Sequence, residues 1–195
     1  MPQVSFDALV AGACVGKVIS FPTDTVPALA VKPENSELIF AAKQRSQDKP
    51  LILMGASAEA LWDFVAGSFE ERQIWQNVAA QYFPGALTLV LPASDRIPKM
   101  MNPVDPTTIG VRVPNCAIAQ SILSQTGPLA TTSANRSGEP PLLSIAEINT
   151  AFPDVLTLKA DELESSKPTS GIPSTVVKWT GEGWQVLRQG AIDLG

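Results

Sequence analysis

The sequence contains no histidine. Histidine is the side chain whose ordinary pKa lies nearest neutrality, so its absence excludes Ser-His and Cys-His catalytic pairs and histidine-ligated metal sites. Cysteine is scarce as well. Cys14 and Cys116 are too few for a cysteine-only zinc site and do not resemble a dense disulfide framework. Any chemistry must therefore come from carboxylates, hydroxyls, lysine, arginine and backbone amides.

Long apolar runs are also missing, because no stretch approaches the roughly 20 residues that span a bilayer. The first basic residue is Lys17, so the N-terminus lacks the basic start of a secretory signal. We therefore expect a cytoplasmic protein with no membrane segment. Only 17% of the residues are charged and the formal net charge is -5, which argues against a chain-wide basic surface for nucleic acid.

The length of 195 residues and the 45% hydrophobic content predict one globular domain, residues 1–195. Apolar spacing and capping residues predict helices over 5–16, 35–45 (capped by Asn35), 57–65, 70–82, 115–125 (capped by Asn115), and a short helix opening at Ser144. Strands are predicted over 17–21, 50–54, 86–91, 107–113, 129–132, 155–158, 174–179 and 184–188. This alternation, with strands dominating at the end, favours one α/β or α+β domain around a mixed sheet.

Segment 21–27 follows a predicted strand and carries Thr23, Asp24 and Thr25 between two prolines. Because proline fixes the backbone φ, these hydroxyls and this carboxylate would point in fixed directions. The segment is either a turn, in which Thr and Asp satisfy nearby amides, or part of a binding site. The local sequence leaves both interpretations open.

Lys43, Arg45 and Lys49 place three positive charges within seven residues, just past a predicted helix and before a buried strand. The negative C-terminal end of the helix accounts for one or two of these charges. The alternative is a site for phosphate or carboxylate at the mouth of the sheet. Arg112 lies in an otherwise apolar strand, so it is predicted to be either salt-bridged or part of an anion site.

Segment 131–138 places several hydroxyls, the Asn135 amide and a glycine directly after a strand. Loops that follow strand ends are where open α/β sheets bind ligands, and a plain turn is the alternative. Ser174 and Arg188 lie on the last two predicted strands. If these strands form a hairpin around residues 181–183, Ser174 and Arg188 lie near the same end of it.

Together these segments resemble the YrdC family of L-threonylcarbamoyladenylate synthases, in its single-domain form. The resemblance spans nearly the whole chain, and its motifs occur in the family's order. They are Pro22-Thr23-Asp24-Thr25-Val26, Lys43-x-Arg45 with Lys49-Pro50-Leu51, Phe83-Pro84-Gly85-Ala86-Leu87-Thr88, Gly110-Val111-Arg112-Val113-Pro114, Ser133-Ala134-Asn135-x-Ser137-Gly138, Ser174-Thr175-Val176-Val177 and Leu187-Arg188-x-Gly190.

The resemblance implies a YrdC/RibB-like fold, in which helices flank a twisted mixed parallel and antiparallel sheet around a deep basic cleft. It implies a nucleotidyltransferase that combines L-threonine, bicarbonate and ATP into threonylcarbamoyl-AMP and pyrophosphate, with Mg²⁺ on the triphosphate. Downstream threonylcarbamoyl-transfer proteins would then modify tRNA, and some members are described as binding tRNA or double-stranded RNA. No residue is implied as a metal ligand.

The resemblance also implies roles for individual residues. Those implied in catalysis are Lys43, Arg45, Ser133 and Asn135; those around ATP are Arg45, Lys49, Thr108, Ser133 and Arg188; those around threonine are Thr25, Arg112, Thr131 and Ser174, with Thr131 contributing a backbone group. The sequence departs from the family on the threonine side, because Pro27 and Ala28 replace Tyr-Gly and Met54 replaces a common histidine.

Three hypotheses follow. The first is an active threonylcarbamoyl-AMP synthase. The second is a non-catalytic paralogue that binds tRNA or double-stranded RNA, or regulates. The third is an adenylating enzyme for another amino acid or carboxylate, which the altered threonine side makes conceivable.

Overall fold

The computed structural model describes residues 3–44, 49–163 and 169–193. Within these ranges the helices are α1 (Phe6–Cys14), α2 (Glu37–Lys43), α3 (Phe69–Tyr82), α4 (Ala117–Thr126) and α5 (Ile145–Ala151). The strands are β1 (Gln3–Val4), β2 (Ile19–Phe21), β3 (Ala28–Val31), β4 (Ile52–Met54), β5 (Leu87–Pro92), β6 (Thr108–Arg112), β7 (Leu129–Ser133), β8 (Leu156–Leu158), β9 (Thr175–Trp179) and β10 (Trp184–Arg188). No helix in the described ranges has both the length and the apolarity needed to cross a bilayer.

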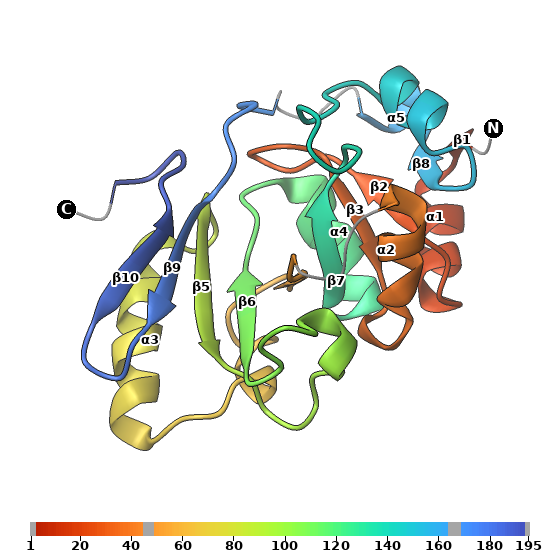
Figure 1. Ribbon diagram of the computed structural model, residues 1–195. Helices are drawn as coiled ribbons and strands as arrows, with labels where there is room; N and C mark the ends of the chain where they lie inside the picture. Colours follow the sequence, from red (N-terminus) through yellow and green to blue (C-terminus); the bar gives the residue numbers. More distant parts are fainter. Residues whose placement is uncertain (1–2, 45–48, 164–168, 194–195) are drawn as a thin grey trace.

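The ten strands form one mixed sheet in the order β1-β8-β2-β3-β7-β4-β6-β5-β9-β10 (Figure 1). The pairs β1/β8, β2/β8, β4/β6 and β5/β9 are parallel, and the others are antiparallel. Two strands were not predicted from the sequence: β3, and β1, which is only two residues long and pairs with β8 at one edge. The predicted mixed α/β architecture is confirmed.

Helices cover the sheet at both ends. Helices α1 and α4 share a core cluster with β2, β3, β4 and β7, and α2 and α3 contribute to a second cluster with β4, β5, β6 and β9. In Figure 1, α3 lies beside β5, β9 and β10, whereas the other helices gather around the opposite half of the sheet. Between these two halves, at the middle of the strand order, lie the ends of β6 and β7 together with the β2–β3 loop.

The helix predicted over 57–65 is wrong. Only a 3₁₀ turn, Trp62–Phe64, forms in this segment. Val65 is extended and makes a bridge with Ala93, so the chain leaves helical geometry there. Leu61, one of the predicted helical residues, packs instead into the core at 1% exposure. Tertiary packing therefore overrides the apolar spacing of this short segment.

Both predicted asparagine caps are displaced by one residue. The cap of α2 is Ser36, after a 3₁₀ turn over Pro33–Asn35, and the cap of α4 is Cys116. Neither Ser36 nor Cys116 caps its helix with a side-chain hydrogen bond. In α4 the Cys116 carbonyl accepts from the Gln120 amide at 2.9 Å, which sets the start of the helix.

The predicted capping box at Ser144 is confirmed, because the Ser144 hydroxyl accepts from the Glu147 amide at 3.3 Å and the Ser144 amide donates to the Glu147 carboxylate at 3.0 Å. We expect Ser144→Ala to lower the free energy of unfolding by about 1 kcal/mol, since an α5 amide loses its acceptor. Urea unfolding measures the change. Ser121→Ala, at an exposed α4 position, is the control and should not lower stability; equal loss in both variants would contradict the capping role.

Candidate active site

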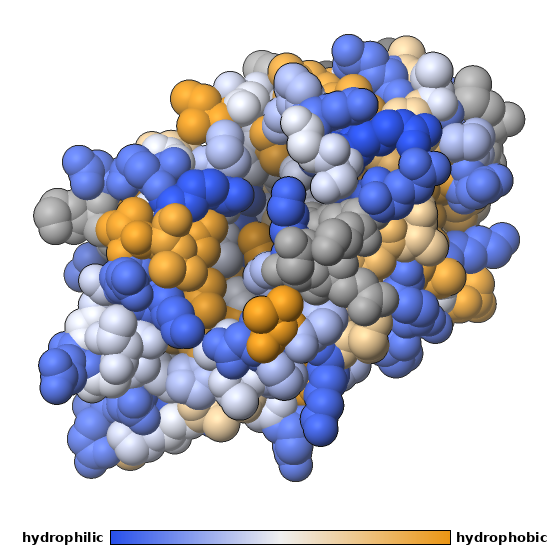
Figure 2. All heavy atoms as spheres, in the orientation of Figure 1, coloured by the Kyte–Doolittle hydropathy of each residue, from blue (hydrophilic) through white to orange (hydrophobic). Residues whose placement is uncertain are grey.

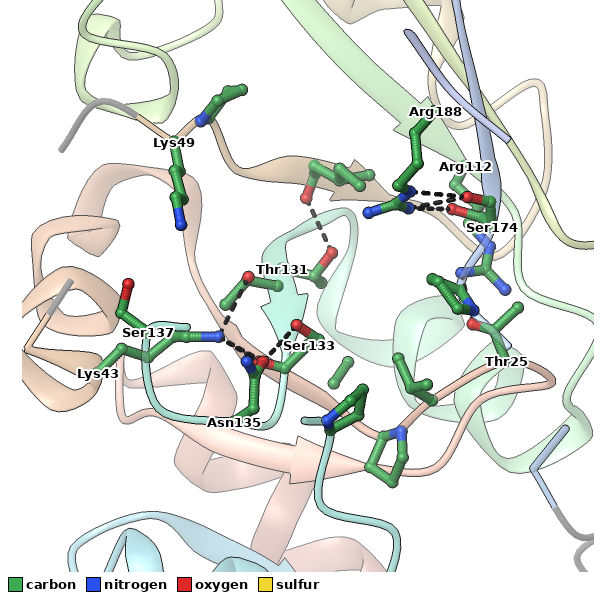
Figure 3. A pocket seen from close by; sticks show the side chains of 18 of the residues that line it. Thr25, Lys43, Lys49, Arg112, Thr131, Ser133, Asn135, Ser137, Ser174 and Arg188 are labelled. Atoms are coloured by element: carbon green, nitrogen blue, oxygen red, sulfur yellow. Dashed lines mark hydrogen bonds between the residues drawn. The ribbon is translucent and has the colours of Figure 1, made fainter. Parts of the chain in front are cut away.

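A cavity of about 340 Å³ lies among the strand ends and loops singled out in the sequence. The face drawn in Figure 2 is hollowed near its middle. Figure 3 shows the cations of the cavity on opposite sides: an arginine end formed by Arg112 and Arg188, and a lysine end formed by Lys43 and Lys49. Between them the polar lining consists of Thr25, Thr131, Thr132, Ser133, Asn135, Ser137, Glu139 and Ser174.

Arg112, the last residue of β6, is 3% exposed. Its Nη2 donates to Asp24 Oδ1 at 2.6 Å, Nη1 donates to Thr25 Oγ1 at 2.8 Å, and Nε donates to the Gly85 carbonyl at 3.0 Å. Arg112 is therefore salt-bridged, which confirms the first predicted alternative, and it also lines the cavity. These three bonds leave two of the five guanidinium N–H donors for a ligand.

Electrostatics at the arginine end favour an anion. Burial lowers the pKa of Arg112, the Asp24 carboxylate opposes that shift, and the charge of Arg188 adds to it. Partial burial of its guanidinium likewise lowers the pKa of Arg188. Guanidinium groups nevertheless stay protonated in proteins, so the two cations repel each other here. A bound carboxylate or phosphate would offset both the burial and the repulsion.

The β9–β10 hairpin brings Arg188 to Ser174, as the sequence predicted. Arg188 Nη2 donates to the Ser174 carbonyl at 2.8 Å and to Ser174 Oγ at 3.2 Å, and Nε donates to the same carbonyl at 3.2 Å. Ser174 Oγ lies 2.9 Å from Thr88 Oγ1 of β5. Ser174, just before β9, and Arg188, at the end of β10, are therefore held together beside Arg112.

Lys43 organises the lysine end. It is 2% exposed, and its Nζ donates to the Ser133 carbonyl, to Asn135 Oδ1 at 3.1 Å and to Thr132 Oγ1 at 3.5 Å. Ser133 Oγ donates to Asn135 Oδ1, and Asn135 Nδ2 donates to the Glu139 carbonyl at 2.7 Å. The predicted Lys43, Ser133 and Asn135 set thus forms one network around the turn that follows β7.

Two further predicted residues line the cavity. Lys49 is exposed at the lysine end, and Thr131 lies on β7, where its hydroxyl donates to the Ile52 carbonyl at 2.9 Å. Arg45 lies outside the described residues. Thr108 is not brought to this cavity. It begins β6, at the other end of the strand from Arg112, and its hydroxyl is bonded within the turn that contains Asp105.

The wall beside the arginine end is apolar. Met54 is the register partner of Arg112 on the parallel strand β4, and it lines the cavity together with Ile52, Pro27 and Ala28. The positions at which the sequence departs from the family are therefore neighbours of Arg112 and Thr25. Any ligand held by these two residues lies beside a surface without hydrogen-bonding side chains.

Three contributors to the arginine end were part of the motifs but were given no individual role in the site. Asp24 is the carboxylate partner of Arg112, Thr23 bonds Thr25, and Thr88 bonds Ser174. The sequence feature that could have identified Thr88 is that it carries a hydroxyl in an otherwise apolar strand. Asp24 carries the only carboxylate in segment 21–27, and a buried arginine requires a partner.

A mixed sheet with two arginines, of which Arg112 is buried, and two lysines around one cavity defines an α/β protein whose cavity suits an anionic ligand. The Sua5/YciO/YrdC family model, whose description reads telomere recombination, matches residues 14–190. The chain therefore belongs to the Sua5/YciO/YrdC family, and the family predicted from its motifs is confirmed.

Relatives in bacteria and archaea support the same assignment. A Vibrio campbellii protein is 31% identical and aligns with 95% of this chain and 99% of its own length. A Pyrococcus abyssi protein is 35% identical over 92% of this chain, which spans 52% of that relative. Both relatives are named threonylcarbamoyl-AMP synthase.

Solved structures agree with the fold. Pyrococcus abyssi Sua5 in complex with L-threonine superimposes with a TM-score of 0.82 at 30% identity, covering 95% of this chain and 54% of that chain. E. coli YciO has a TM-score of 0.81 and covers 99% of this chain and 94% of its own, at 24% identity, which supports the fold alone.

Proposed function

We propose that this chain is a threonylcarbamoyl-AMP synthase, a nucleotidyltransferase that forms threonylcarbamoyl-AMP and pyrophosphate from L-threonine, bicarbonate and ATP. The observation that carries the proposal is that two separate groups of cationic side chains, the arginine end and the lysine end, line one cavity. The names of the relatives, and the L-threonine bound to the related Sua5, support this choice of reaction.

The arginine end would hold the amino acid. Arg112 offers two free N–H donors in a planar fork, the geometry that suits a carboxylate. Thr25 lies in contact with that guanidinium, and Ser174 and Thr131 line the same cavity. A charge-assisted hydrogen bond contributes roughly 1.5–3 kcal/mol, enough for Arg112 to anchor the carboxylate of an amino acid.

The lysine end would hold the nucleotide. Lys49 offers charge to the triphosphate from the lysine end, Arg188 would contact it from the arginine end, and Lys43 holds the Ser133–Asn135 turn beside it. Arg45 completes the proposed ATP set on the strength of the family resemblance alone. Phosphoryl and nucleotidyl transfer depends chiefly on positioning and charge stabilisation, which these side chains supply without histidine.

The reaction would proceed in two steps. The amine of L-threonine and bicarbonate condense to a carbamate with loss of water. A carbamate oxygen then attacks the α-phosphorus of ATP, the bond from that phosphorus to the bridging oxygen breaks, and pyrophosphate leaves. The nucleophile already carries negative charge, so this second step needs no histidine base.

Mg²⁺ would enter with ATP. Among residues 3–44, 49–163 and 169–193, no group of three His, Cys, Asp or Glu side chains is placed to hold a metal ion. Phosphate oxygens and water, which Mg²⁺ prefers, would therefore supply its coordination, and the bound ion would neutralise charge on the leaving pyrophosphate.

A non-catalytic RNA-binding function is the second candidate, and the burial of two of the four cavity cations speaks against it, whereas Lys49 and Arg188 are exposed. Lys43 and Arg112 are 2% and 3% exposed, so a tRNA or duplex backbone cannot reach them as it reaches a basic surface. We propose that the product is instead passed to threonylcarbamoyl-transfer proteins, and that tRNA is modified there.

Product analysis by mass spectrometry tests the proposal. With ATP, Mg²⁺, bicarbonate and a panel of amino acids, we expect threonylcarbamoyl-AMP and pyrophosphate only when threonine and bicarbonate are both present. Chelation of Mg²⁺ with EDTA should stop the reaction. An adduct of a different amino acid would assign another substrate, and no adduct under any condition would contradict the proposed function.

A further inference from the structure

Thr23 is buried at 1% exposure and is absent from the cavity lining, yet it bonds Thr25, which is 0% exposed and contributes to that lining. Its hydroxyl donates to the Val26 carbonyl at 2.7 Å. Its oxygen lies 3.1 Å from both the Thr25 amide nitrogen and Thr25 Oγ1. A hydroxyl has one proton and two lone pairs. Because the carbonyl takes the proton, Thr23 must accept from both groups of Thr25.

The direction of these hydrogen bonds fixes the orientation of the Thr25 hydroxyl. Its proton points to Thr23 Oγ1, and one of its lone pairs accepts from Arg112 Nη1 at 2.8 Å. The remaining lone pair is therefore all that the Thr25 hydroxyl can offer the cavity. Arg112 presents only donors beside it. A ligand that bonds both side chains must therefore carry a hydrogen-bond acceptor for Arg112 next to a hydrogen-bond donor for Thr25.

We infer that Thr23 is a positioning residue that makes Thr25 an acceptor for the substrate amine while Arg112 holds the substrate carboxylate. This inference rests on the proposed function and adds a residue outside the cavity lining that decides which polar group of the amino acid Thr25 can bind. The acceptor, Thr25 Oγ1, and the donor, Arg112 Nη1, lie 2.8 Å apart, which suits an amine and a carboxylate on one carbon.

The charges of the site support the same assignment. Arg112 and Arg188 both face this end of the cavity, and positive neighbours disfavour an ammonium ion relative to a neutral amine. The neutral amine is the form that attacks bicarbonate. A Thr25 lone pair that accepts one amine N–H leaves the nitrogen lone pair free to react.

Isothermal titration calorimetry with two ligands tests the inference without turnover. The ligands are L-threonine and (R)-3-hydroxybutyrate, which keeps the carboxylate and hydroxyl but lacks the amine. Thr23→Val removes the hydroxyl at constant shape, so the Thr25 proton is free to turn toward the cavity. We expect the preference for L-threonine over the deamino ligand to fall about tenfold, and the affinity for (R)-3-hydroxybutyrate to stay unchanged.

Thr23→Ser is the matched control, because it keeps the hydroxyl and should keep the wild-type preference. Should Thr23→Val fail to fold, Thr23→Ala removes the same hydroxyl without adding a methyl group, and the same loss is expected. An unchanged preference in the hydroxyl-less variant would overturn the inference, as would an equal loss in Thr23→Ser. Wild-type protein that prefers L-threonine but forms no adenylate would overturn the proposed function alone.

Discussion

Replacing Arg112 by alanine is expected to abolish threonylcarbamoyl-AMP formation and to lower the free energy of unfolding by about 3 kcal/mol, the lower end of the cost of breaking a buried ion pair. The lower end applies because the Asp24 side chain is 16% exposed whereas that of Arg112 is 4% exposed. The substitution leaves Asp24 without its cation and the Gly85 carbonyl without its donor. Product analysis and urea unfolding measure the two effects.

A double variant separates stability from function. Adding Asp24→Ala to Arg112→Ala removes the orphaned carboxylate, so part of the lost stability should return while product formation stays absent. Arg96→Ala is the control for removing an ion-paired arginine. Arg96 and Asp63 lie 2.7 Å apart with side chains 58% and 75% exposed, so at most about 1 kcal/mol should be lost. Wild-type activity in Arg112→Ala would contradict the proposed role of Arg112.

Replacing Gly190 by alanine is expected to lower kcat/KM about 100-fold, because small displacements of catalytic geometry are costly. A Cβ at Gly190 would lie 2.3 Å from the Pro173 carbonyl oxygen and 2.5 Å from the Ser174 carbonyl carbon. These are backbone atoms, so the strand itself must shift. Ser174, and with it Arg188, would then move away from Arg112. Steady-state kinetics measure the loss.

Gly183→Ala provides the matched comparison. Gly183 lies in the same β9–β10 hairpin, and a Cβ there meets nothing within 4 Å. This variant should keep wild-type kinetics. Overpacking at Gly190 should also lower stability by roughly 1–3 kcal/mol. If both alanine variants had equal kinetics, close packing against Ser174 would not be the reason for the glycine in the Leu187-Arg188-x-Gly190 motif.

Motif order and strand patterning predicted much of this molecule. The eight predicted strands and the hairpin that joins Ser174 to Arg188 are all present, because apolar runs bounded by turn residues report directly on local structure. The helix over 57–65 was predicted wrongly, since Val65 pairs with Ala93, a residue far along the chain. Local spacing carries no information about such a partner.

The residues of the site were predicted less completely than the strands. Lys43, Ser133 and Asn135 were grouped correctly by motif, but that Lys43 directs its ammonium group to the turn after β7 is a property of the folded sheet. Thr108 was grouped with the nucleotide residues, and the structure places it at the far end of β6 from Arg112. Thr108 and Arg112 are close in sequence, but they lie at opposite ends of one strand, so their side chains do not reach the same cavity.

The sequence by itself determined the kind of chemistry available. Without histidine and with only two cysteines, the protein must work through arginine, lysine, hydroxyls and carboxylates. Tertiary structure alone decided which of these groups meet. Asp24 and Arg112 are 88 positions apart, and only the mixed sheet order brings the β2–β3 loop to the end of β6. Hydrogen-bond direction at Thr23 and Thr25 likewise follows from burial, because each proton there must find an acceptor within the protein.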